Sequence, residues 1–403
     1  MTQDRFDVVL YGATGFTGRQ TAHYFAAHAP PDLRWAIAAR NAGKLEALAT
    51  DLGCAPGVIV ADSTDAASVD AMCARARVLL TTAGPFALYG DVVVDAAVRR
   101  RAHYVDITGE TPWVRRLIDR HHAQAAADGT RIVPCCGFDS VPSDLGTWMV
   151  VEHFRAQNTA TRTVSASFKA KGGLNGGTAA SAIALGESGD AALLGDTLLL
   201  NPPTHRTSAE RARSHDRRRP TWDADRKVWL APFFMAPVNT RVVRRSNALA
   251  DEAGAAYGPA FAYDEAMETR RRTQAWGVTL ALGAFEQAVR RPLGRAALKR
   301  LSPRPGQGPS DKVMDGGFFR VRLVGEAEDG RKVMAVMQAD GDPGNRVTVK
   351  CLCESALALA TQADALPGGA RRGGVLTPAF ALGDVLLDRL RAVGFTATVT
   401  PIA

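Results

Sequence analysis

The first eighteen residues hold the feature that most constrains the fold of this chain. An apolar run, residues 8–11, ends at three glycines spaced G-x-x-G-x-x-G, and a helical pattern follows at once. A strand, a tight turn and a helix N-terminus in this order let backbone N–H groups approach a pyrophosphate closely. Because the motif has the flanking elements that it requires, it predicts a dinucleotide site, the alternative being a glycine-rich turn without a ligand. The residues predicted to contact the dinucleotide here are Gly12, Thr14, Gly15, Phe16, Thr17 and Gly18.

The end of the second predicted strand, residues 34–39, favours NADP over NAD. A carboxylate at this position would bind the ribose 2′-hydroxyl and repel a 2′-phosphate. The chain instead has Arg40, then Asn41 as a helix N-cap, then Lys44 one turn later. A guanidinium can pair with a phosphate through two hydrogen bonds, and an ammonium adds a further positive charge. We therefore expect NADP(H), with Arg40 and Lys44 at its 2′-phosphate; the alternative for Arg40 is a solvated arginine at a strand end.

The alternation of strands and helices continues to about residue 145 and predicts an α/β fold with a doubly wound parallel sheet, that is, a Rossmann-like domain. Further strands are expected at residues 58–61, 78–82, 104–107 and 132–135, each followed by polar residues or glycine. Ligands bind at the carboxyl ends of such strands, so these ends are expected to share one crevice. They add to the predicted cofactor site Asp62, Ser63, Ala83, Gly84, Pro85, Phe86, Gly137 and Phe138.

Antiparallel patterns replace this alternation in the second part of the chain. Residues 163–171 have the pattern of a half-buried strand, and residues 318–326 and 332–340 predict a hairpin. The glycine-rich stretch 172–178 is either an anion-binding loop or a flexible connection. These patterns predict a second, α+β domain that binds substrate and, if the chain forms a homodimer, also carries the dimer interface.

The predicted organisation therefore has three parts. Residues 1–145 form the NADP-binding Rossmann-like domain, and residues 146–370 form the α+β domain. Residues 371–403 are expected to form a C-terminal helix and a short strand that pack back on the first domain. A length of 403 residues and a hydrophobic content of 46% suit two globular domains.

Composition indicates a cytoplasmic protein. Residues 2–7 are polar and charged, which does not fit a signal peptide, and no apolar run approaches the roughly 20 residues that cross a bilayer. The six cysteines lack the spacing of a metal site, so we expect buried small residues in a reducing compartment, with a reactive Cys135 or Cys136 as the alternative. Neither a bound metal nor a nucleic-acid partner is expected.

The net charge of +8 lies in one segment, residues 270–304, which has nine basic residues and one acid, Glu286. Within it, residues 276–289 are largely apolar. Such a segment could associate peripherally with an anionic membrane, or bind an acidic carrier protein or coenzyme A. The alternative is a buried helix with a solvated basic rim.

Several blocks of sequence, in order, resemble the saccharopine dehydrogenase-like oxidoreductases over nearly the whole chain. The chain is most similar to the actinobacterial trans-acting enoyl reductases within that group. Its first glycine loop, Ala-Thr-Gly-Phe-Thr-Gly, differs from that of true saccharopine reductases, which argues against activity in the lysine pathway. The matching blocks are residues 11–18, 38–41, 82–86, 104–110, 136–144, 176–178, 305–310 and 374–378.

This resemblance implies an NADPH-dependent reductase that acts on an α,β-unsaturated acyl substrate, carrier-bound or bound to coenzyme A, in polyketide or lipid synthesis. The reaction needs a hydride for the β-carbon, stabilisation of charge on the thioester oxygen and a proton for the α-carbon. Tyr89, Asp139 and Ser140 are the candidate catalytic residues, and each could instead be a turn or helix-capping residue. Two alternatives remain: an imine reductase of the saccharopine type, and a weakly active cofactor-binding protein at a lipid surface.

Overall fold

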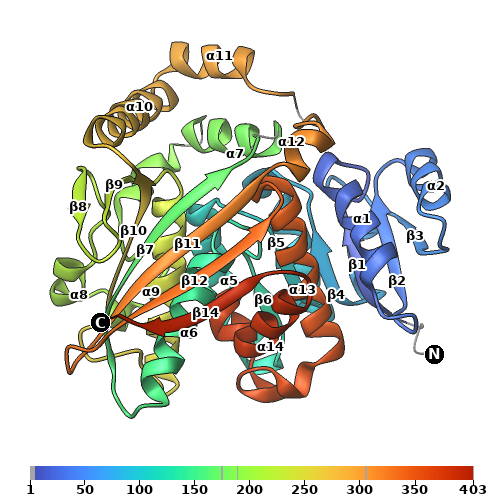
Figure 1. Ribbon diagram of the computed structural model, residues 1–403. Helices are drawn as coiled ribbons and strands as arrows, with labels where there is room; N and C mark the ends of the chain where they lie inside the picture. Colours follow the sequence, from blue (N-terminus) through green and yellow to red (C-terminus); the bar gives the residue numbers. More distant parts are fainter. Residues whose placement is uncertain (1–4, 174–175, 188, 305, 403) are drawn as a thin grey trace.

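Two seven-stranded sheets form the framework of the protein (Figure 1). The structure is a computed structural model that describes residues 5–173, 176–187, 189–304 and 306–402. The first sheet is parallel throughout, with the order β13-β6-β5-β4-β1-β2-β3. This is the predicted doubly wound, Rossmann-like arrangement, and the strand order reverses between β1 and β4. Its strands are β1 (Phe6–Tyr11), β2 (Trp35–Ala39), β3 (Gly57–Val60), β4 (Ala76–Thr81), β5 (His103–Asp106), β6 (Arg131–Val133) and β13 (Gly374–Val375).

Alternate residues of these strands point into two apolar cores, one on each face of the first sheet. Val8 and Leu10 lie in one core, whereas Val9 and Tyr11 lie in the other. Residues of α1, α2 and α13 contribute to the first core, and residues of α3, α4 and α5 contribute to the second. The helices are α1 (Phe16–His28), α2 (Ala42–Asp51), α3 (Ala66–Ala74), α4 (Phe86–Arg100), α5 (Thr111–Asp128) and α13 (Thr348–Thr361).

The second sheet is mixed, with the order β14-β12-β11-β7-β10-β9-β8. Its strands β7 and β10 are parallel and all its other pairs are antiparallel. The predicted hairpin is present as β11 and β12. Helices α6 and α9 pack against this sheet. The elements are α6 (Val141–Arg155), β7 (Thr161–Lys171), α8 (Ser208–Arg213), β8 (Thr221–Asp223), β9 (Val228–Pro232), α9 (Ala236–Glu252), β10 (Ala262–Thr269), α12 (Asp311–Asp315), β11 (Phe318–Ala327), β12 (Lys332–Asp340) and β14 (Thr396–Pro401).

The C-terminal region joins both sheets. Helix α13 packs against α1, β1 and β4 of the first sheet, and β13 pairs with β6. The predicted C-terminal helix is α14 (Pro378–Ala392), which packs on α13 and α6. The predicted final strand is present as β14, but it pairs with β12 in the second sheet instead of packing on the first domain. The reason is that β12 has one edge free of β11, and β14 satisfies the backbone groups of that edge.

Helices α10 (Arg272–Arg290) and α11 (Pro292–Leu301) form an arm on the outside of the second domain, beyond α7 (Gly176–Glu187) (Figure 1). The arm contains the predicted apolar segment 276–289. Ala275 is the buried residue of α10, and none of α11 is buried. The segment is therefore not the buried helix of the alternative interpretation. Among the described residues, no helix is both long and apolar enough to span a membrane.

Candidate functional site

The glycine loop after β1 has the geometry that a pyrophosphate requires. Gly12 has a φ of +87°, and a Cβ there would lie 2.9 Å from the backbone nitrogen of Ala83. A Cβ at Gly18 would lie 2.1 Å from the carbonyl oxygen of Gly12, so this glycine lets α1 pack closely on the loop. Gly15 is exposed and is the N-cap of α1. A Cβ at Gly15 would approach only the Gly12 oxygen, at 3.3 Å, so the loop is open on that side.

The N-terminus of α1 has no side-chain cap, in contrast to the next three helices. Asn41 caps α2 and Asp65 caps α3. Glu110 accepts hydrogen bonds from two backbone nitrogens at the start of α4. The first N–H groups of α1 therefore remain available for a bound anion, and the helix dipole favours negative charge there.

Two cations lie at the end of β2, as the sequence predicted. Arg40 and Lys44 are both exposed, and their side chains have no hydrogen bond or ion pair with any described residue. The N-cap of Asn41 is confirmed, since its side-chain oxygen accepts from the Lys44 backbone nitrogen at 2.9 Å. Asp62 lies at the end of β3, where hydrogen bonds from Thr64 and the positive charge of Arg40 lower its pKa. The glycine cradle, the uncapped helix and these cations fit NADP(H).

The carboxyl ends of β1 and β4 lie side by side. The point at which the strand order reverses is therefore beside the glycine loop. Thr82 donates to the carbonyl oxygen of Gly12 at 3.3 Å, and the bond between Gly84 and Pro85 is cis. Gly84 is exposed and Ala83 is half-buried, so both are accessible to solvent. Phe86 instead is buried and stacks on Trp113.

Two buried carboxyl groups organise the neighbouring strand ends. Asp106 accepts from the backbone nitrogens of Thr108 and Cys135 and from the Tyr104 hydroxyl, and burial raises its pKa to about 7. Glu110 accepts from the nitrogens of Phe86 (3.0 Å) and Ala87 (2.8 Å).

Glu110 also accepts from the Ser181 hydroxyl of α7 at 2.8 Å, so α7 covers this part of the crevice. The sequence identified residues 108–110 as a strand end without assigning a role to Glu110. The signal that could have indicated a role for Glu110 is its position, since it is an acidic residue between a strand end and the start of a helix.

The three candidate catalytic residues lie in different environments. Tyr89, on α4, is 43% exposed. Asp139 is partly exposed and has no hydrogen-bond or ion-pair partner in the described part of the chain; desolvation raises its pKa to about 6. Ser140 is fully buried and has a φ of +137°, a strained value for a residue with a side chain. Asp139 is therefore the one of the three that is partly exposed and whose pKa burial moves toward neutral pH.

Ser140 belongs to a buried polar network that links the two sheets. Its hydroxyl donates to Asn239 of α9 at 3.1 Å, and Asn239 donates to Glu265 of β10 at 2.9 Å. Ser143 and Tyr263 also donate to Glu265, at 2.9 Å each. Burial raises the pKa of Glu265 to about 7.

Gly137 and Phe138, predicted at the cofactor, are buried beside this network. The Phe138 ring packs edge-on against Phe168 and Phe319 of the second sheet. Its backbone nitrogen donates to the Thr348 hydroxyl at 3.1 Å. Phe138 therefore links the two sheets in this structure, and contact of Gly137 and Phe138 with the cofactor remains a prediction.

The predicted anion loop 172–178 is described in part, because Leu174 and Asn175 lie outside the described residues. Two of its amides already have acceptors. The Gly176 nitrogen donates to the Gln307 carbonyl at 2.9 Å, and the Gly173 nitrogen donates to the Asp342 carboxylate at 3.5 Å. Two backbone N–H groups of this loop are therefore already satisfied within the protein and are not free to bind an anion.

Comparison with known proteins decides the family. Residues 8–133 match the family model described as the saccharopine dehydrogenase NADP binding domain. A candidate trans-acting enoyl reductase of Mycobacterium tuberculosis is 39% identical over 426 aligned residues, covering 100% of this chain and 99% of that protein. A trans-acting enoyl reductase of Mycobacterium ulcerans is 35% identical, covering 99% and 98%. The chain belongs to the saccharopine dehydrogenase-like oxidoreductases.

The fold agrees with this assignment. The saccharopine dehydrogenase (L-Glu forming) of Saccharomyces cerevisiae has a similar structure, with a TM-score of 0.53 at 14% identity, covering 98% of this chain and 99% of that one. Together with the matching NADP-binding domain, the family makes this protein an NADP-dependent oxidoreductase. The cofactor that the glycine loop and Arg40 predicted is thus confirmed as NADP(H).

The cysteines of this oxidoreductase differ in exposure. Cys54 lies in the loop between α2 and β3 and is exposed, contrary to the prediction that all six are buried. Burial raises the pKa of the Cys135 and Cys136 thiols well above the ordinary value, so both remain protonated. Within the described residues, no group of three or more His, Cys, Asp or Glu side chains could hold a metal ion.

Proposed function

We propose that this oxidoreductase is an NADPH-dependent enoyl reductase that saturates an α,β-unsaturated acyl thioester in polyketide or lipid synthesis. The observation that carries the proposal is identity of 35–39% with proteins named as trans-acting enoyl reductases across essentially the whole chain. A Rossmann-like domain alone is common to many reductases, whereas this similarity includes the second domain.

The residues of the crevice can be assigned tasks in this reaction. Bound NADPH supplies the hydride. The N–H groups at the start of α1 would hold the pyrophosphate, and Arg40 and Lys44 the 2′-phosphate. Asp139, whose pKa is raised to about 6, is the group that we assign as proton donor to the α-carbon. Ser140, fixed by Asn239, would act as a positioning residue for this turn.

The direct test of substrate class is a comparison of two kinds of substrate. The protein is mixed with NADPH and either an enoyl thioester, such as a coenzyme A or N-acetylcysteamine ester, or a semialdehyde and glutamate, which form an imine. The proposal expects NADPH oxidation with the enoyl thioester and none with the imine-forming mixture. Oxidation with the imine mixture alone would establish the saccharopine-type alternative.

The same proposal includes a membrane surface for the arm of α10 and α11. Large apolar side chains on the arm are exposed: Trp276 by 41%, Leu280 by 69% and Leu293 by 86%. Arg290, Arg291 and Arg300 are exposed and lack partners within the described residues. Apolar side chains beside unpaired cations are typical of a peripheral contact with anionic lipid.

Co-sedimentation with vesicles tests this surface. Binding to phosphatidylglycerol vesicles at low salt, little binding to phosphatidylcholine vesicles, and a steep loss at 1 M salt are expected, because the Debye length then falls to about 3 Å. Changing Arg290, Arg291 and Arg300 to Gln should weaken binding to the anionic vesicles. Lys299 is left intact because it pairs with Glu187 at 2.7 Å. Equal binding to both vesicles would contradict the electrostatic part of the account.

A further inference from the structure

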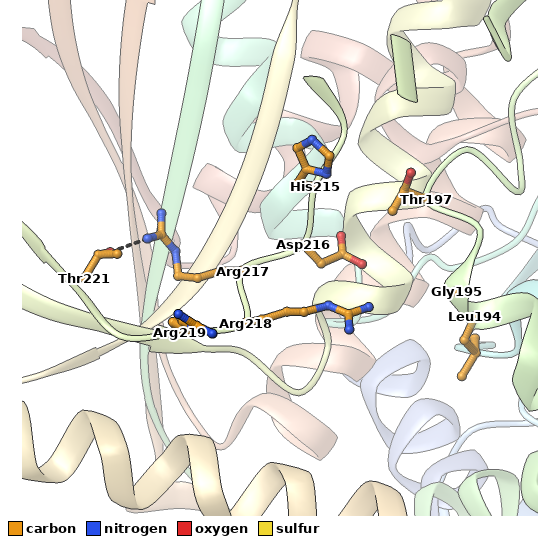
Figure 2. Close-up of a pocket in the computed structure, with 9 residues that line it drawn as sticks. All are labelled: Leu194, Gly195, Thr197, His215, Asp216, Arg217, Arg218, Arg219 and Thr221. Carbon is orange, nitrogen blue, oxygen red and sulfur yellow. Dashed lines mark hydrogen bonds between the residues drawn. The ribbon is translucent and has the colours of Figure 1, made fainter. Parts of the chain in front are cut away.

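A cation-rich cavity lies in the second domain (Figure 2). It has a volume of about 460 Å³ and is lined by the end of the short helix η1 (Asp190–Gly195), by Thr197, by residues 215–219 and by Thr221. None of the predicted cofactor or catalytic residues lines it. The size is within the range of pockets that hold small molecules.

The carboxylates around this cavity are already bound to guanidinium groups. Asp216 pairs with Arg241 and Arg244, which are buried side chains of α9. Asp264 pairs with Arg217. These carboxylates therefore have no capacity to neutralise a further cation in the wall.

Two arginines of the wall are left without a partner. Arg218 and Arg219 are exposed, and neither makes a hydrogen bond or ion pair with any residue in the described ranges. Figure 2 shows the Arg217 guanidinium turned to Thr221, whereas the Arg218 side chain extends in the opposite direction, toward Leu194 and Gly195. Three guanidinium groups line the cavity, those of Arg217, Arg218 and Arg219. The Asp216 carboxylate in the same wall already pairs with the buried Arg241 and Arg244, so it does not compensate Arg218 and Arg219.

We propose that this cavity binds the phosphate group of a small phosphorylated ligand, independently of NADP(H). Guanidinium groups form charge-assisted, paired hydrogen bonds with phosphate oxygens, and the hydroxyls of Thr197 and Thr221 in the wall can donate to the same oxygens. The cavity is larger than one phosphate needs, so an organic group attached to the phosphate also has room. Inorganic phosphate and a phosphorylated metabolite share this chemistry, and the test separates them.

The test is isothermal titration of the full-length protein with NADPH at saturation, so that the dinucleotide site is filled. The probes are inorganic phosphate and adenosine 3′,5′-bisphosphate. The pocket variant carries Arg218→Gln and Arg219→Gln. The matched control carries Lys169→Gln and Arg371→Gln, two exposed cations outside the cavity.

The parent and the control should bind a phosphate probe with NADPH present, and the pocket variant should bind it about 10–100-fold more weakly, as the loss of charged hydrogen bonds predicts. NADPH affinity should be equal in all three proteins, which also shows that each is folded. Tighter binding of the bisphosphate would identify an organic phosphate as the ligand class, and equal binding would identify phosphate alone.

Two results would overturn the proposal. One is that the parent binds neither probe once NADPH is saturating. The other is that the pocket variant binds the probes as tightly as the parent. If the double variant fails to bind NADPH and is therefore misfolded, the single charge reversal Arg218→Glu is measured in its place, with the same expected loss.

Discussion

At the scale of single residues, Arg40 is the group on which cofactor selectivity depends. Its guanidinium is exposed and unpaired within the described chain at the end of β2, where we place the 2′-phosphate. Arg40→Ala should weaken NADPH binding about 10–100-fold, the worth of one charge-assisted paired contact, and should leave NADH binding nearly unchanged. Titration of both cofactors measures this, with Arg300→Ala on α11 as the control. An unchanged preference for NADPH in Arg40→Ala would remove the assignment.

The glycine loop gives a matched pair of substitutions. A Cβ at Gly15 meets only the Gly12 oxygen at 3.3 Å, so Gly15→Val should fold and yet block the approach of the pyrophosphate. A Cβ at Gly18 would lie 2.1 Å from the same oxygen, so Gly18→Val should lower the melting temperature as well. Circular dichroism and NADPH titration separate the two effects. Normal NADPH binding by folded Gly15→Val would contradict the placement of the pyrophosphate.

Asp139 gives a prediction about pH. A proton donor must carry its proton, and the pKa of this carboxyl is about 6, so kcat with an enoyl thioester should fall as pH rises through 6. Asp139→Asn should lower kcat by about 100-fold or more and abolish that inflection. Tyr89→Phe is the comparison, since this phenol is the other accessible candidate. A large loss in Tyr89→Phe with little change in Asp139→Asn would transfer the role to Tyr89.

At the scale of elements, the network around Glu265 couples α9 and β10 to the end of β6. An exposed glutamate has a pKa of about 4.3, whereas burial raises that of Glu265 to about 7. The folded state therefore holds the proton more tightly than the unfolded state. This contribution to stability is present at low pH and is lost as pH rises to about 7.

Urea unfolding at pH 6 and pH 8 tests this coupling. The parent should lose about 1 kcal/mol more of its free energy of unfolding over this interval than Glu265→Gln, since the neutral amide has no proton to release. Glu326→Gln, near the end of strand β11, should behave like the parent. Identical pH dependence in parent and Glu265→Gln would show that the buried carboxyl does not titrate in this range.

The elements also show what a sequence can predict. The strands and caps of the first sheet follow from local patterns: an apolar run, a turn residue and a helix start, as at Gly12 and Asn41. Helix α9 carries no such signal, because Arg241, Arg244 and Arg245 look like solvent-facing residues. They are buried because Asp216 and the carbonyl groups of distant segments satisfy their guanidinium groups. Such long-range pairing is not encoded in a local pattern.

At the scale of the whole molecule, the two domains depend on each other. The C-terminal segment supplies α13 and β13 to the first sheet and β14 to the second. The sequence predicted the pieces near the right positions but not this exchange, since pairing between distant edges is decided by the assembled sheets. The domain boundaries that we placed at residues 145 and 370 therefore remain a prediction.

Local patterns predict the cofactor half of the site residue by residue, and these contacts stay predictions, whereas the environment of the catalytic half could not be predicted from the sequence. Glycine spacing and a cation at a strand end are local signals for a phosphate site, as at Gly15 and Arg40. Glu110 and Asp139 acquire their environments from burial, which depends on α7 and on the second domain. Their burial and contacts therefore became visible only in the three-dimensional arrangement.

The central claim is that this protein transfers a hydride from NADPH to the β-carbon of an enoyl thioester. The most direct measurement uses NADPH deuterated at C4 of the nicotinamide ring, in each of its two stereoisomers, with analysis of the acyl product by mass spectrometry and NMR. The account predicts a saturated thioester with one deuterium at the β-carbon from one of the two stereoisomers. Full NADPH binding without transfer of deuterium to any enoyl thioester would contradict it.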